Sequence, residues 1–123
     1  MQRDMELVRD LLVKIEEDES KGGFSFVAEE GYKFTNDEIE YHLELMINAG
    51  LIDGKVFHTF DGAIIDIKSL TWQGHDFLDA ARSDKVWAKA EKTAQDKGMD
   101  LSSLPLDIVK DLLVESAKKI LGF

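Results

Sequence analysis

The sequence predicts an α+β fold in which helices surround one short antiparallel sheet. In several stretches of the chain, apolar residues recur every three to four positions, which is the period of an amphipathic helix. Between Leu51 and Ser69 the period changes to two, β-branched and aromatic residues dominate, and Asp61-Gly62 supplies a hairpin turn signal. A length of 123 residues is enough for one sizeable hydrophobic core.

The first two elements are expected before residue 28. A helix is predicted from about Arg3 to Glu17, and the short aromatic segment Phe24–Val27 is predicted to be a strand. The apolar residues that set the helical spacing are Met5, Val8, Leu12 and Ile15.

The clearest helix signal is a T-x-x-E capping box at Thr35–Glu38. The helix that it begins is predicted to extend to about Ala49, and Gly50 supplies the left-handed residue that ends it. Its apolar face consists of Ile39, Leu43, Met46 and Ile47.

The rest of the chain is predicted to contain two strands and three helices. The strands are expected at Leu51–Phe60 and Ala63–Ser69, and Thr71 is expected to cap the helix that follows. Ser83 caps a helix over 84–97, and a last helix begins at Pro105. We expect its apolar face, which includes Ile120, to dock over Trp72, Phe77 and Trp87 or to pair with a second copy.

This order of elements resembles a winged helix-turn-helix domain. The resemblance depends on A-G-L-I (Ala49–Ile52) before the ribbon and L-T-x-x-G (Leu70–Gly74) after it. It implies a winged-helix-like domain over residues 1–82 (helix, short strand, capped helix, two-stranded wing, helix) and a C-terminal helical extension over 83–123, packed on it. One departure is that 28–34 is too short, and too interrupted by glycine, for the helix that normally precedes the recognition helix.

Four longer motifs, which together span nearly the whole chain, resemble the bacterial and prophage domain-of-unknown-function family 2513. They are R-D-M-E-L-V-R-D-L-L (Arg3–Leu12), E-I-E-Y-H-L-E-L-M-I-N-A-G-L-I (Glu38–Ile52), L-T-W-Q-G-H-D-F-L-D-A-A-R (Leu70–Arg82) and L-P-L-D-I-V-K-D-L-L (Leu104–Leu113). The resemblance implies a small cytoplasmic protein, often phage-associated, with a winged-helix-like core. It brings no catalytic residues with it.

The composition excludes several classes of protein. There is no cysteine, which rules out disulfide scaffolds, thiol nucleophiles and cysteine-ligated zinc. No apolar run approaches the eighteen or so residues of a membrane span, and Met1–Asp10 carries five charges, so we expect neither a membrane helix nor a signal peptide and place the protein in the cytoplasm. His42, His58 and His75 lack metal-ligand spacing. We therefore expect no enzyme activity, no metal and no cofactor.

The net charge of −10 bears on DNA binding. Residues 1–79 hold eighteen acids and seven bases, whereas 80–123 hold seven acids and eight bases. Between Thr35 and Gly50 there are four acids and no lysine or arginine, which disfavours contact between this helix and phosphates. A DNA-binding regulator of the winged-helix class stays open as the alternative, using lysines elsewhere: Lys55 and Lys68 in the ribbon, and Lys85, Lys89 and Lys92 on one face of the next-to-last helix.

The outward face of the capped helix suggests a different partner. An exposed tyrosine and leucine among acids suit a protein partner with a basic groove that accepts aromatic groups. This face consists of Asp37, Tyr41, Glu44, Leu45 and Asn48. Alternatively, its tyrosine and leucine simply pack on the Phe24–Val27 strand or the last helix. The favoured function is a non-enzymatic protein-interaction or regulatory module of bacterial or prophage origin.

Overall fold

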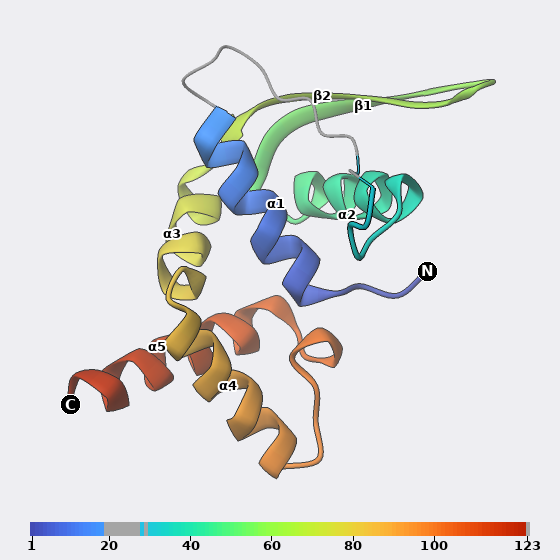
Figure 1. Ribbon diagram of the computed structural model, residues 1–123. Helices are drawn as coiled ribbons and strands as arrows, with labels where there is room; N and C mark the ends of the chain where they lie inside the picture. Colours follow the sequence, from blue (N-terminus) through green and yellow to red (C-terminus); the bar gives the residue numbers. More distant parts are fainter. Residues whose placement is uncertain (19–27, 29, 123) are drawn as a thin grey trace.

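The computed structural model is an α+β fold with five α-helices and one two-stranded antiparallel sheet, and it describes residues 1–18, 28 and 30–122 (Figure 1). The Phe24–Val27 strand predicted above lies outside the described residues. The elements are α1 (Met5–Asp18), α2 (Asn36–Asn48), β1 (Ile52–Thr59), β2 (Gly62–Leu70), α3 (Trp72–Ala81), α4 (Asp84–Asp96), the short 3-10 helix η2 (Leu101–Ser103) and α5 (Leu106–Leu121).

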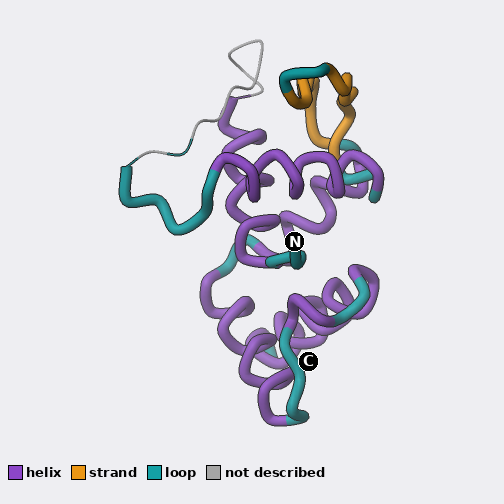
Figure 2. The backbone as a smooth tube through the Cα atoms, turned by 90° about the vertical axis from the view of Figure 1, so that its right-hand side faces the viewer, coloured by secondary structure: helices purple, strands orange, loops and turns teal. Residues whose placement is uncertain are grey.

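Helix α1 is the central element of the packing. It contacts α2, α3, β2 and η2, and Leu7, Leu11 and Leu12 on it are fully buried. Helices α4 and α5 pack on α3 and on each other at the end of the molecule opposite the hairpin (Figures 1 and 2). The buried apolar side chains form one cluster that extends along the sequence from Met5 to Leu113. The division of the chain at residue 82 stays a prediction.

The predicted helix caps at Thr35, Thr71 and Ser83 are confirmed. The Thr35 hydroxyl accepts from the Glu38 amide at 3.2 Å, and the Glu38 carboxylate accepts from the Thr35 amide at 3.1 Å, which completes the capping box. Helix α1 begins at Met5 rather than Arg3, because the Asp4 carboxylate accepts from the Glu6 amide at 2.9 Å and so occupies the capping position.

The hairpin is anchored where α2 ends and α3 begins. Gly50 has a φ of +80°, which turns the chain out of α2 into β1. The Thr71 amide donates to the Leu51 carbonyl at 3.1 Å, and the Thr71 hydroxyl donates to the Gly50 carbonyl at 2.5 Å. Gly74, in the first turn of α3, packs so closely that a Cβ there would lie 2.0 Å from the Leu51 carbonyl oxygen. The two motifs A-G-L-I and L-T-x-x-G therefore meet, and they close the base of the hairpin.

Beyond this base, β1 and β2 project from the body as an arm (Figure 1). Val56 pairs with Ile65 on the face toward α2, and Phe57 pairs with Ile64 on the opposite face. The face toward α2 is held close to it in two ways: His58 Nε2 lies 3.1 Å from Glu44 Oε1, and the missing side chain at Gly54 leaves room for Ile47.

The expectation that the last helix covers Trp72 is wrong. Phe77 and Trp87 are buried as expected, but Trp72 is 81% exposed. It precedes Gly74 by two positions, so it lies on the side of α3 opposite the buried residues Gly74, Phe77 and Leu78. Ile120 is 40% exposed because the C-terminal end of α5 extends away from the body (Figure 1).

The close contact at Gly74 generates a stability prediction. Gly74→Ala should lower the free energy of unfolding by about 3 kcal/mol, because the added methyl group meets a backbone carbonyl that cannot move without opening the hairpin base. Urea denaturation followed by circular dichroism measures this. The neighbouring, exposed Gln73→Ala is the matched control and should change stability little. Equal stability of the two variants would contradict the contact.

Candidate functional site

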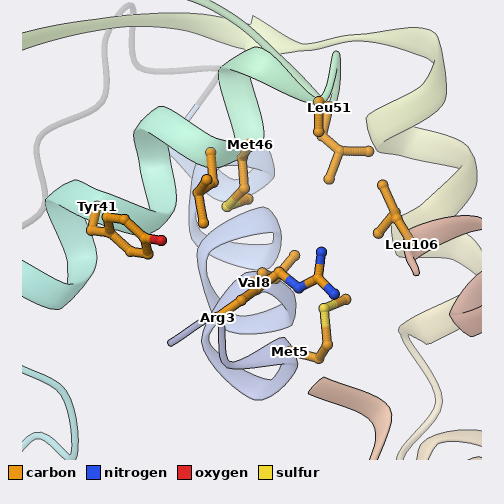
Figure 3. Close-up of a pocket in the computed structure, with 9 residues that line it drawn as sticks. Arg3, Met5, Val8, Tyr41, Met46, Leu51 and Leu106 are labelled. Carbon is orange, nitrogen blue, oxygen red and sulfur yellow. The ribbon is translucent and has the colours of Figure 1, made fainter. Parts of the chain in front are cut away.

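The α1, α2 and α5 helices enclose an apolar pocket with a volume of about 310 Å³ (Figure 3). Met5 and Val8 come from α1, Leu51 from the hairpin base, and Leu106 is the first residue of α5. The α2 helix and its C-cap residue contribute four side chains along one side of the pocket: Tyr41, Leu45, Met46 and Ala49. The pocket therefore combines three segments that are far apart in the sequence: residues 3–8, 41–51 and Leu106.

Two polar groups stand at this pocket. Tyr41 projects from α2, and Arg3 projects from the segment before α1 (Figure 3). Arg3 Nη2 donates to the Leu104 carbonyl oxygen at 2.7 Å, which ties the start of the chain to the loop before α5. Among the described residues, the Arg3 Nε and Nη1 atoms and the Tyr41 hydroxyl have no hydrogen-bond partner. They can donate to a ligand at the mouth of the pocket.

His42 fixes α2 against α1 beside this pocket. The ring is fully buried; its Nε2 accepts from the Asp4 amide at 2.8 Å, and its Nδ1 donates to the Glu38 carbonyl at 2.7 Å. Because Nε2 accepts a backbone hydrogen bond, this arrangement requires the neutral ring with its proton on Nδ1. Both nitrogens are occupied, so His42 is a structural residue.

The five residues predicted to form the contact face all lie on α2, but they differ in their surroundings. Asp37 and Asn48 are exposed near the two ends of the helix, while Tyr41 and Leu45 are half-buried at the pocket. Glu44 faces the hairpin, where it pairs with His58. The face therefore has a centre that opens into a pocket, and the exposed Asp37 lies one helical turn before Tyr41. Leu106 of α5 lies across the pocket from α2 rather than sealing it.

The lysines of the DNA-binding alternative fall in two places at opposite ends of the molecule. Lys55 and Lys68 are exposed on the hairpin, where Lys55 stands opposite Asp66. Lys85, Lys89 and Lys92 lie on α4, and Lys92 Nζ is 3.6 Å from Asp96 Oδ1. The structure does not bring these two groups together (Figure 1).

A second hollow, of about 420 Å³, is polar and was not indicated by the sequence. It is lined by ion pairs between α1 and the α3–α4 region: Arg9 with Asp84 at 2.6 Å, and Arg82 with Glu16 at 2.8 Å beside it. Hydrogen bonding to Arg82 lowers the pKa of Glu16. No local pattern signals this cluster, because its charges come from segments about seventy positions apart in the sequence.

Tyr32 closes one side of the polar hollow. Its hydroxyl donates to the Asp10 carboxylate at 3.2 Å. Burial of the phenol, together with the nearby charge of Asp10, raises the pKa of Tyr32 to about 12. In the part of the chain that the structure describes, no three histidine, aspartate or glutamate side chains gather closely enough to hold a metal ion.

These features define a small α+β domain with an apolar pocket beside an acidic helix face. The chain belongs to the family described as "Hypothetical protein (DUF2513)", whose model matches residues 2–100. It is also 33% identical over 112 residues to a protein of Haemophilus influenzae described as "Uncharacterized protein", a match that covers 91% of this chain and 92% of that relative. No solved structure matches the chain. Among the described residues, no helix has both the length and the apolar character needed to cross a membrane.

The surroundings of Tyr32 predict how it titrates. In a Tyr41→Phe background, which leaves Tyr32 as the chain's one tyrosine, phenolate absorbance should rise with a midpoint near pH 12, and Asp10→Asn should move the midpoint toward 10. Because the folded pKa lies above the unfolded value of 10, this group's contribution to stability is fully present below pH 10 and is lost as the pH rises toward 12. A midpoint near 10 in the folded protein would contradict the buried contact.

Proposed function

We propose that this protein is a non-enzymatic, winged-helix-like protein-interaction module, which acts in regulation and binds a partner through α2. The observation that carries the proposal is the position of Tyr41 and Leu45 at an apolar pocket, on a helix that has four acids and no lysine or arginine. The pocket lining supports binding rather than catalysis. It is aliphatic, with one phenol and one guanidinium, and it pairs no nucleophile with a base.

The chemistry of the surface specifies the partner. Apolar groups that fill a central pocket provide most of the energy of a protein interface, and charges at the rim set orientation and specificity. Here the pocket takes an apolar side chain, while Asp37 and Glu40, on α2 outside the pocket lining, favour lysine or arginine on the partner. We therefore expect the partner to present an aromatic or aliphatic anchor next to basic residues.

The winged-helix-like interpretation is supported by the order of the elements. A capped helix, a hairpin and a further helix follow one another, and α2 occupies the place of the recognition helix. On DNA, that place requires contact with phosphates, which four uncompensated acids oppose. The lysines of the alternative lie on the hairpin and on α4, at opposite ends of the molecule, and do not offset this. The order of elements thus supports the architecture, and the charges support a protein partner over DNA.

The proposal is tested with designed peptides and the isotope-labelled full chain. We expect peptides with one phenylalanine or leucine flanked by lysines to shift the NMR signals of the pocket residues, and peptides flanked by glutamates to shift them less. Leu45→Asp and, separately, Tyr41→Ala should weaken this binding by roughly tenfold or more. The matched control is Leu121→Asp, the same change at an exposed leucine at the far end of α5.

Two results would contradict the proposal. One is that neither peptide series affects the pocket residues. The other is that duplex DNA binds at physiological salt in a mobility-shift titration, and that Lys85→Glu with Lys89→Glu abolishes this binding; the result would favour the DNA-binding alternative, because phosphate contacts weaken steeply with added salt. Binding to DNA at low salt alone is the non-specific behaviour expected of any exposed lysines and leaves the proposal in place.

A further inference from the structure

The hairpin arm carries large apolar side chains that its own molecule does not cover. Phe60, at the turn, is fully exposed, and the cross-strand pair Phe57 and Ile64 is 53% and 58% exposed. These three side chains form the arm's apolar tip. Isolated exposed apolar residues are ordinary, but three together at the end of a projecting element indicate a contact surface.

The tip cannot fill the pocket of its own molecule. Leu51, which lines the pocket, immediately precedes β1 at the base of the arm. An eight-residue strand extends roughly 26 Å, so Phe60 is held about that far from the pocket. Whatever meets the tip comes from another molecule.

We propose that the tip of one molecule docks on a second copy of this chain, with Phe60 inserted into the pocket beside α2. The inference rests on the proposed function for the pocket that it uses. It departs from that proposal in the residue beside the anchor, which is the acid Asp61 and faces Arg3 of the pocket lining rather than the acids of α2. The size is suitable: a cavity of about 150 Å³ can hold benzene, and this pocket measures about 310 Å³. The lining is also suitable, because Met5, Val8 and Leu45 offer the aliphatic contacts that a phenyl ring needs.

Charge complementarity supports a second copy as the occupant. Asp61 follows Phe60 directly at the turn and has no ion-pair partner among the described residues. Arg3 stands at the pocket with its Nε and Nη1 atoms still able to donate. When Phe60 enters the pocket, Asp61 arrives beside Arg3. The tip and the pocket therefore match in shape and in charge.

The tip-and-pocket contact is reciprocal if the two copies are related by a two-fold axis. Each tip then docks in the other molecule's pocket. A reciprocal contact closes the assembly at two copies, whereas a one-way contact would continue into a filament.

Sedimentation velocity of the full chain over a wide range of concentrations tests this. The wild type should form dimers. Phe60→Ser should weaken association by roughly tenfold or more, because it removes the anchor. It should leave the circular dichroism spectrum unchanged, because the side chain is fully exposed. Leu121→Ser is the matched control, since Leu121 belongs to a different exposed apolar face, the one shared by α3 and α5.

Mixing variants gives a second test that does not depend on how a single variant folds. Phe60→Ser retains an intact pocket, and Leu45→Asp retains an intact tip. Each should be monomeric alone, whereas a mixture should form heterodimers through one complete tip-and-pocket contact. Asp61→Lys should weaken the dimer, and Arg3→Glu in the same chain should restore at least part of it by exchanging the charges.

Other outcomes overturn the inference. They are a wild type that stays monomeric at every concentration, a Phe60→Ser chain that associates as the wild type does, or a dimer that only Leu121→Ser disrupts. If the wild type is monomeric while lysine-flanked peptides still occupy the pocket, the inference fails and the proposed function stands. If the dimer is lost with Phe60→Ser but not with Leu45→Asp, the tip is an interface that docks elsewhere, and the inference fails while the peptide experiment still decides the proposed function.

Discussion

The backbone carbonyl of Leu51 is the point on which the arrangement of the hairpin depends. It accepts a hydrogen bond from Thr71, the residue that caps α3, and it lies against Gly74 with no room for a side chain between them. The start of β1 and the end of β2 are thus held together by backbone contacts. Because these contacts involve no long side chain, they fix the direction of the arm more firmly than surface ion pairs would.

The same residue links the hairpin to the pocket. While the Leu51 carbonyl binds the start of α3, its side chain lines the pocket beside α2 (Figure 3). The positive φ of Gly50 allows both contacts, since it turns the chain sharply at the end of α2. The α2 helix is also fixed from its other side, through the buried His42 and its hydrogen bond from Asp4. The pocket is therefore preformed between elements whose positions are set by other contacts, and this favours binding without large rearrangement.

Features of the fold that depend on neighbouring residues could be predicted from the sequence, and features that depend on distant ones could not. The capping box at Thr35, the stop at Gly50 and the turn at Asp61-Gly62 each involve a few adjacent residues with specific backbone chemistry. The pocket needs residues from α1, α2 and α5, and no periodicity shows how these helices approach one another. Tyr41 and Leu45 could be placed on an outward face by helical spacing, but Arg3 and Leu106 could not be joined to them. Trp72 shows the same limit within one helix: its size suggested burial, and its position relative to Gly74 decided otherwise.

Charge constrains how two copies of this chain could meet. A net charge of −10 on each molecule opposes association at long range, so any contact between copies must depend on apolar burial and on local pairs of opposite charge. Added salt screens the long-range repulsion, and it screens a single pair such as Arg3 with Asp61 as well. Since the repulsion sums over the whole surface and the pair is one contact, association of two copies should strengthen as salt is added. Binding to nucleic acid has the opposite dependence, because each phosphate contact releases counterions. The sign of the salt response therefore separates the two kinds of partner without knowledge of the interface.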